Sequence, residues 1–251
     1  MLRVLILAIM PFMIFSQENF PNDRVRKTNQ IIYAFINAEI YINHEKKINN
    51  GILIIKEDKI LNVGQNISIP ENAKIFDLNG FKICPSFIDI YTEYGQLSQN
   101  YKSKLSSWNP ALNIEFNAID NFNINKKEAE SFIKNGFGLV NTFRKDGIIR
   151  GSSALIFLSY DKPHESILLD QSALCMSFDK GTSNESYPKS LMGAIALLRQ
   201  AYYDLNWYKE QSQIFNSSLK SFNTKIYLPK IFEVENYNSI FRANKIADEF
   251  N

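Results

Sequence analysis

The sequence is poor in the residues that build disulfide and metal sites, with 2 Cys and 2 His in 251 residues. Cys84 and Cys175 lie far apart and lack Cys-x-x-Cys spacing, which argues against a zinc ribbon or a disulfide framework. Both lie in apolar runs, so we expect two buried free thiols, although an oxidising compartment would permit a bridge. His44 and His164 have no second histidine and carboxylate at ligand spacing, and we expect both to be solvated or hydrogen-bonded.

The sequence also lacks an excess of either charge: 28 Lys and Arg residues against 26 Asp and Glu residues give a formal net charge of only +2. The basic residues are scattered and form no stripe, so the sequence does not favour nucleic acid as a partner. Phosphate-binding Gly-Lys-Ser/Thr loops, Gly-x-Ser-x-Gly and His-Glu-x-x-His are all absent, which leaves nucleotide hydrolase, serine esterase and thermolysin-like protease without support. With 45% hydrophobic and 22% charged residues, the chain can bury one sizeable core or two modest ones.

The chain begins with a short basic flank and an apolar run from Val4 to Phe15. These are the proportions of a secretory signal peptide, and the run is too short to span a bilayer. We predict a signal peptide over residues 1–16, a polar leader over 17–30 and no membrane span after cleavage, which places the mature protein in the periplasm or outside the cell. An amino-terminal anchor or a buried helix is the alternative.

Residues 31–84 alternate apolar and polar positions and use β-forming residues. The pattern predicts strands over 31–43, 51–56, 59–63 and 73–78, which we interpret as a small antiparallel β-sandwich domain. The Asn79-Gly80 turn follows the last of these strands. Pro85 interrupts the next apolar stretch, and we take it as the start of a second domain.

Residues 85–251 alternate strand-like and helix-like segments, which favours an α/β fold with a parallel sheet and covering helices. We expect helices over 126–135, 188–208 and 236–250, and strands over 139–143, 154–159, 173–178 and 226–234. A (β/α) barrel of eight strands needs about 250 residues. The domain is therefore either a complete open sheet or a partial TIM-type barrel, and we favour the partial barrel.

Two stretches carry the most specific pattern: Gly51 to Gly64, which reads GILIIKEDKILNVG, and Ile75 to Gly95, which reads IFDLNGFKICPSFIDIYTEYG. Together they resemble the amino-terminal region of the amidohydrolase superfamily, and among its branches the exported imidazolonepropionase-like proteins. The resemblance implies a small β-sandwich that leads through a Pro-Gly-Phe-Ile-Asp segment into a metal-binding His-x-His pair on the first barrel strand. Here Ser86 replaces the glycine of that segment.

The positions that match the His-x-His pair are Tyr91 and Glu93. Residues two apart on a strand point the same way, so two imidazoles at this spacing can share a divalent ion such as zinc, which activates a bound water. Glu93 can still offer a carboxylate oxygen, but a neutral Tyr91 is a poor ligand. The metal motif is therefore degenerate, and a zinc or other divalent cofactor is implied by the resemblance alone.

Two arginines are candidate substrate-binding residues. Arg150 lies between Gly147 and Gly151 in an expected flexible loop, where it could hold an anionic group or be a surface residue of a tight turn. Arg199 lies one helical turn from Tyr203, where it could stack at a pocket rim or belong to an ordinary amphipathic face.

Two functions remain open, and a poorly folded product of a damaged gene is a third interpretation. In the first, the parent protein hydrolyses carbon–nitrogen bonds in a small cyclic amide or peptide-like ligand, and this chain is incomplete or inactive by itself. In the second, the scaffold is a non-catalytic binding or assembly module. Segments such as Asp146 to Ser153, DGIIRGSS, resemble longer exported members of the family, which implies a second amidohydrolase-like unit as a partner.

Overall fold

The computed structural model of the chain describes residues 31–57, 59–96, 108–159, 166–211 and 213–250. The predicted signal peptide, the predicted leader and His164 lie outside these ranges. The chain divides into two compact units, with the boundary between Pro85 and Ser86. Within the described ranges, no helix is both long and apolar enough to cross a membrane.

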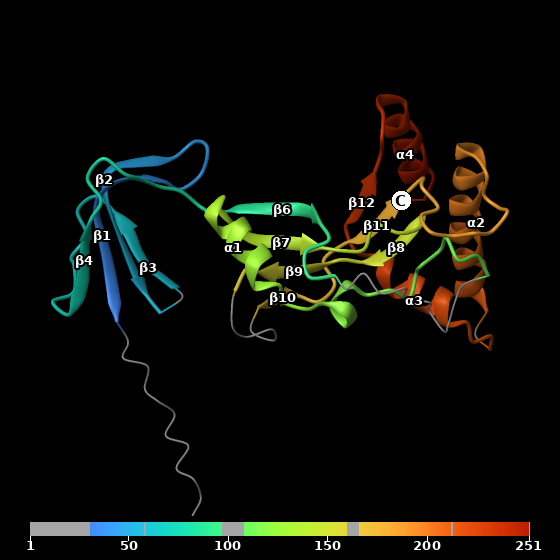
Figure 1. Cartoon of the computed structure of the whole chain (residues 1–251), viewed down its shortest axis with the longest axis horizontal. Helices are drawn as coiled ribbons and strands as arrows, with labels where there is room; N and C mark the ends of the chain where they lie inside the picture. Colours follow the sequence, from blue (N-terminus) through green and yellow to red (C-terminus); the bar gives the residue numbers. More distant parts are fainter. Residues whose placement is uncertain (1–30, 58, 97–107, 160–165, 212, 251) are drawn as a thin grey trace, which may run out of the picture. The chain divides into compact units, whose positions relative to one another are not determined.

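The first unit contains one five-stranded sheet (Figure 1). Its strands are β1 (Ile32–Tyr41), β2 (Lys47–Lys56), β3 (Lys59–Gly64), β4 (Ala73–Asp77) and β5 (Lys82–Ile83). The order is β3-β2-β1-β4, and β5 also pairs with β1. Apolar side chains of β1 and β2, Ala38, Ile40 and Leu53, form a small buried core.

The predicted antiparallel sandwich is wrong in two respects. The strands form a single sheet, and the sheet is mixed, because both β4 and β5 run parallel to β1. The β2–β3 hairpin is antiparallel as expected, and Glu57 occupies its turn with a φ of 57°. The loop before β4 carries the chain back to begin beside the start of β1, which reverses the expected direction of β4.

The second unit contains two sheets (Figure 1). One has the order β10-β9-β7-β6 and the other has the order β12-β11-β8. Their strands are β6 (Phe87–Thr92), β7 (Phe137–Thr142), β8 (Ile149–Ser152), β9 (Ala154–Phe157), β10 (Ile167–Leu169), β11 (Leu174–Ser177) and β12 (Lys230–Glu233). The predicted α/β fold is confirmed, but the expected parallel sheet is present only in part: β6–β7 and β11–β12 are parallel pairs, whereas the other pairs of both sheets are antiparallel.

The β8–β9 segment links the two sheets most directly. Only Ser153, which is fully buried, separates β8 from β9. Strand β9 is antiparallel to β7, and β8 is antiparallel to β11. Because β8 and β9 follow each other along the chain, β7 and β11 run in the same direction. The strands β6, β7, β11 and β12 therefore share one direction, and the β8–β9 segment runs against them.

The helices of this unit follow the sequence pattern closely. They are η1 (Ala118–Asn121), α1 (Lys126–Lys134), α2 (Leu191–Glu210), α3 (Ser217–Lys225) and α4 (Tyr237–Phe250). Asn125, Ser190 and Asn216 each accept a hydrogen bond from the first turn of α1, α2 and α3. The expected strand over 226–234 is shorter than predicted, and the sequence analysis missed α3 before it, since polar Ser, Asn and Lys residues mask its apolar face.

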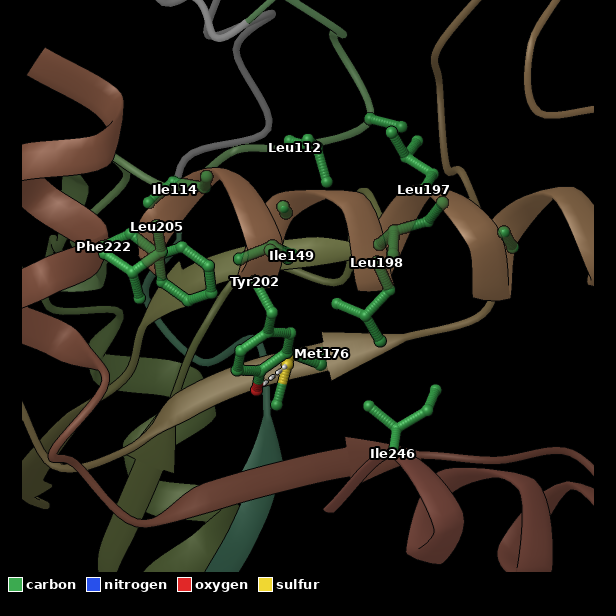
Figure 2. Packing of buried hydrophobic residues seen from close by; sticks show 14 of the residues in the cluster. Leu112, Ile114, Ile149, Met176, Leu197, Leu198, Tyr202, Leu205, Phe222 and Ile246 are labelled. Atoms are coloured by element: carbon green, nitrogen blue, oxygen red, sulfur yellow. Dashed lines mark hydrogen bonds between the residues drawn. The ribbon is translucent and has the colours of Figure 1, made fainter. Parts of the chain in front are cut away.

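The main core lies between the β12-β11-β8 sheet and helices α2, α3 and α4 (Figure 2). Helix α2 contributes Leu197, Leu198, Tyr202 and Leu205, and Figure 2 shows them with Met176 of β11. The Tyr202 hydroxyl contacts the Met176 sulfur at 3.8 Å. Of the aromatic residues near the end of α2, Tyr202 is buried in this core, whereas Tyr203 and Trp207 are 54% and 50% exposed.

The cysteines are both free, but their environments differ from the expectation. Cys175 is fully buried in β11, and burial raises the pKa of its thiol to about 11. Cys84 is exposed in the first unit, so the prediction of a buried thiol is wrong there.

Lys225, at the end of α3, is the one fully buried lysine among the described residues. Its Nζ donates to the carbonyls of Ile114 and Phe116 at 2.7 and 2.9 Å. Burial lowers the pKa of its ammonium group from 10.5 to about 8, against the opposing effects of Glu115 and Asp120. The folded chain therefore releases this proton at a lower pH than the unfolded chain does.

We expect this lysine to make the protein more stable as the pH rises from about 8 to 10, because the unfolded state binds more protons there. Urea unfolding at pH values of about 7.5 and 9.5 measures the effect. Relative to Lys225→Met, the wild-type free energy of unfolding should gain about 2 kcal/mol over this interval. An equal pH dependence in both proteins would contradict the assignment.

Candidate functional site

The degenerate pair lies at the carboxyl end of β6. Tyr91 is in β6, and Glu93 follows the last residue of that strand. Both approach Lys145 in the loop after β7: the Lys145 backbone N–H donates to Glu93 Oε1 at 2.8 Å, and the Lys145 ammonium lies 4.1 Å from the Tyr91 ring centroid. The two residues therefore lie near the carboxyl ends of the parallel strands β6 and β7.

Arg150 is the central cation of this site. Its side chain is 3% exposed and forms an ion pair with Glu233, at the end of β12, which is 34% exposed. Arg150 Nε donates to the Gly147 carbonyl at 3.1 Å, and its guanidinium lies 3.5 Å from the Tyr91 hydroxyl. We name this group, Tyr91, Arg150 and Glu233, the tyrosine–arginine cluster.

The local backbone explains why Arg150 is buried. The expected loop is strand β8, and Gly147 and Gly151 on either side of Arg150 adopt φ values of 95° and 79°. Left-handed φ values favour glycine, and they bend the backbone sharply before and after the arginine. The prediction of a flexible loop is wrong, and the anionic group beside Arg150 is a carboxylate of the protein itself.

The pKa values follow from this arrangement. Burial and the adjacent Glu233 carboxylate raise the pKa of the Tyr91 hydroxyl to about 12. Burial by itself would raise the pKa of Glu233, but hydrogen bonds from Tyr91 and Arg150 outweigh it and hold that pKa below its ordinary value. Near neutral pH the cluster therefore consists of a neutral phenol, a carboxylate and a guanidinium.

These residues do not fit a divalent metal ion. Within the described ranges, no group of three or more His, Cys, Asp or Glu side chains gathers closely enough to bind one. Tyr91 keeps its proton, and the Arg150 guanidinium already neutralises Glu233. His44, in the first unit, has an 87% exposed side chain. We therefore derive no catalytic step through a metal from this cluster.

A polar cavity of about 480 Å³ lies next to Glu93. Its lining includes Gly95, Gln96 and the first residues of α1, Lys126, Lys127 and Glu128. Gln96 Nε2 donates to Thr142 Oγ1 at 3.2 Å, whereas its buried Oε1 accepts no hydrogen bond within the described part of the chain. The cavity adds polar groups beside Glu93.

Arg199 has a different environment from Arg150. It lies on α2, is 39% exposed, and its Nε donates to Glu249 Oε2 of α4 at 2.7 Å. The Tyr203 hydroxyl donates to the other oxygen of Glu249 at 3.0 Å. Arg199 and Tyr203 are therefore neighbours, as their spacing predicted, and they link two helices.

The sequence analysis missed Glu233 and Lys145. Glu233 follows the apolar pair Ile231 and Phe232 in β12, and a carboxylate that is partly buried needs a partner. The sequence therefore indicated that Glu233 needs a partner. It did not identify Arg150 as that partner, because Arg150 lies 83 residues earlier in the chain.

No family model matches the chain. A segment of 55 residues is 36% identical to a dihydroorotase of Aquifex aeolicus, and one of 75 residues is 31% identical to dihydroorotases of Bacillus thuringiensis and Bacillus anthracis. These segments cover 22% and 30% of this chain, and 13% and 17% of those proteins.

One solved structure extends the similarity to most of the chain. The crystal structure of an amidohydrolase from Thermotoga maritima superposes with a TM-score of 0.71 and 21% sequence identity, over 87% of this chain and 62% of that one. The fold is that of an amidohydrolase. The dihydroorotase segments add a local sequence similarity to this similarity of fold. The chain spans less than two thirds of this structural relative.

Proposed function

We propose that this chain is part of an exported amidohydrolase-like protein of the imidazolonepropionase-like branch. The parent protein would hydrolyse carbon–nitrogen bonds in small cyclic amides or peptide-like compounds, with a second amidohydrolase-like unit as a partner. The chain itself would be a partial β/α barrel with a degenerate metal motif. The similarity of fold to the Thermotoga maritima amidohydrolase supports the proposed amidohydrolase-like scaffold. The apolar run from Val4 to Phe15 supports export to the periplasm or beyond.

One observation carries the proposal that the site is inactive by itself. A buried guanidinium, Arg150, neutralises the carboxylate of Glu233 beside Tyr91. A metal-dependent hydrolase needs anionic or neutral ligands that surround the ion and leave one position open for water. Here the cation is part of the protein and cannot polarise a bound water in the same way.

We expect the purified chain to show no hydrolysis of dihydroorotate or other small cyclic amides above buffer, with or without added zinc. The assay follows ring opening by absorbance and uses the Tyr91→Phe/Glu93→Gln double variant as the matched control. An activity that persists unchanged in the control is contamination. Hydrolysis that a chelator abolishes, zinc restores and the double variant lacks would overturn the proposal.

A non-catalytic binding or assembly module is the second candidate. The replacement of both positions of the metal pair, by Tyr91 and Glu93, favours it. The ion pair between Arg150 and Glu233 beside Tyr91 forms without a metal ion. The two candidates share the same scaffold and differ in whether the parent protein performs hydrolysis elsewhere.

A further inference from the structure

The turn between β4 and β5, in the first unit, contains the exposed pair Asn79 and Gly80. The Phe81 backbone N–H donates to the Leu78 carbonyl at 2.9 Å across this turn, and Gly80 has a φ of 84°. A positive φ at the third residue of a β-turn is typical of a type II turn, which favours glycine there. The Gly80 N–H lies outside the strand pairing and donates no hydrogen bond within the described part of the chain.

The Asn79 side chain is also unrestrained. Its backbone N–H donates to Asp77 Oδ1 at 3.1 Å, but its side-chain amide forms no hydrogen bond with the residues that the structure describes. The space beside Gly80 is open, because a Cβ built there would meet no atom within 4 Å. The side-chain carbonyl carbon of Asn79 is therefore free to approach the nitrogen of the next residue, Gly80.

The sequence contains two further Asn-Gly pairs, and the structure restrains both of them. One follows helix α1, where the Gly136 N–H donates to the Ile133 carbonyl at 2.9 Å. The Asn135 side-chain Nδ2 donates to the Ser131 carbonyl at 2.8 Å. The glycine nitrogen and the asparagine amide are thus both held by the end of the helix.

The other pair, Asn50 and Gly51, lies within strand β2. Gly51 is buried opposite Ala38 of β1, and a Cβ built on it would lie 2.6 Å from the Ile40 side chain. A movement of the Gly51 nitrogen towards the Asn50 side chain would have to open the β1–β2 pairing. Of these three identical dipeptides, only the one at Asn79 combines an exposed turn, a free amide and an unbonded glycine N–H.

We propose that Asn79 is a modification site, at which spontaneous deamidation produces aspartate and isoaspartate. A base in solution removes the Gly80 amide proton, and the nitrogen forms a bond to Asn79 Cγ while the Cγ–Nδ2 bond breaks and ammonia leaves. The product is a five-membered succinimide, which water opens at either carbonyl. Opening at Cγ leaves aspartate, whereas opening at the main-chain carbonyl leaves isoaspartate, in which Cγ carries the bond to Gly80. Water is the co-reactant, so the step does not depend on the activity of the parent protein.

Isoaspartate would change the connection between β4 and β5. It adds one carbon to the main chain between Leu78 and Phe81, the two residues whose hydrogen bond closes the turn. The Phe81 carbonyl also accepts from the Glu39 N–H at 3.1 Å, next to the pairing of β5 with β1. We therefore expect the Glu39 N–H to exchange with solvent faster in the isoaspartyl form than in the unmodified chain.

Peptide mass spectrometry of the intact chain, incubated at mildly alkaline pH, tests the proposal. In the folded chain, Asn79 should deamidate at least about tenfold faster than Asn50 or Asn135, because their glycines must first leave a strand or a hydrogen bond. In guanidinium chloride the three rates should converge, because the dipeptides are identical once the chain is unfolded. An endoprotease that cuts before aspartate but not before isoaspartate separates the two products.

Asn79→Gln keeps a side-chain amide but lengthens the side chain, so the five-membered ring cannot form and the modification at this turn should be lost. Asn135→Gln is the matched control, and it should leave the rate at Asn79 unchanged.

Equal rates at the three sites of the folded chain, or a faster reaction at Asn50 or Asn135, would overturn the proposal. An Asn79 that stays intact while the denatured chain reacts would also overturn it, as would a deamidated product without isoaspartate. Zinc-dependent amide hydrolysis by the chain would instead sink the proposed function and leave the modification site standing.

Discussion

Arg150→Met should lower the free energy of unfolding of the second unit by about 2 kcal/mol. The substitution keeps the length of the aliphatic side chain but removes the guanidinium, which leaves the Glu233 carboxylate and the Gly147 carbonyl without their buried donor. The buried Gly147 carbonyl loses its donor outright, whereas the Glu233 carboxylate, which is 34% exposed, regains part of its solvation from water. Urea unfolding at neutral pH, followed by circular dichroism, measures the change.

Arg199→Met is the matched control for this prediction. Arg199 also pairs with a glutamate, but the Arg199 side chain is 39% exposed, and the Glu249 carboxylate keeps its hydrogen bond from the Tyr203 hydroxyl after the substitution. Exposed ion pairs contribute between about 0 and 1 kcal/mol. Equal losses in the two variants would show that burial of Arg150 does not determine its contribution. In that case the tyrosine–arginine cluster would have no special role in the fold.

Gly151→Ala should destabilise the second unit by about 3 kcal/mol or more. Gly151 has a φ of 79°, which an L-alanine adopts only at a cost, and a Cβ there would lie 2.1 Å from the Phe116 carbonyl oxygen. That oxygen accepts hydrogen bonds from the Lys225 ammonium and from the Ser152 backbone N–H, so it cannot move freely. The measurement is the midpoint of thermal or urea unfolding.

Gly136→Ala is the control that separates the cost of a left-handed backbone from the cost of a steric clash in the loss of stability. Gly136 has a φ of 88°, but a Cβ there meets only Phe87 atoms at ordinary distances of 3.4 and 3.6 Å. Its substitution should cost about 1 kcal/mol, the penalty for left-handed backbone in a non-glycine residue. If Gly151→Ala lowered the free energy of unfolding no more than Gly136→Ala does, β8 would not lie as close to the Phe116 carbonyl as described.

Local patterns in the sequence predicted local structure well. The helix over 126–135 begins at the Asn125 cap and ends before Gly136, which has a φ of 88°. The spacing of Leu198 and Tyr202 predicted the buried face of α2. These features depend on neighbours within one or two helical turns, which a sequence displays directly.

Contacts between residues far apart in the chain could not be predicted from the sequence. The parallel pairing of β4 with β1 depends on the loop between β3 and β4, and no residue pattern specifies it. The ion pair between Arg150 and Glu233 joins residues 83 positions apart. The sequence located Tyr91, Glu93 and Arg150, but the arrangement of the site depends on β12, which brings Glu233 to the other two members of the cluster.

The central claim is that a guanidinium, rather than a metal ion, neutralises the carboxylate at the carboxyl end of these strands. Zinc content measures it most directly: the folded chain is dialysed against excess zinc, then against metal-free buffer, and analysed by mass spectrometry. We expect substoichiometric zinc, equal to that of the Tyr91→Phe/Glu93→Gln variant. About one zinc per chain, removed by a chelator and absent from the variant, would contradict the claim.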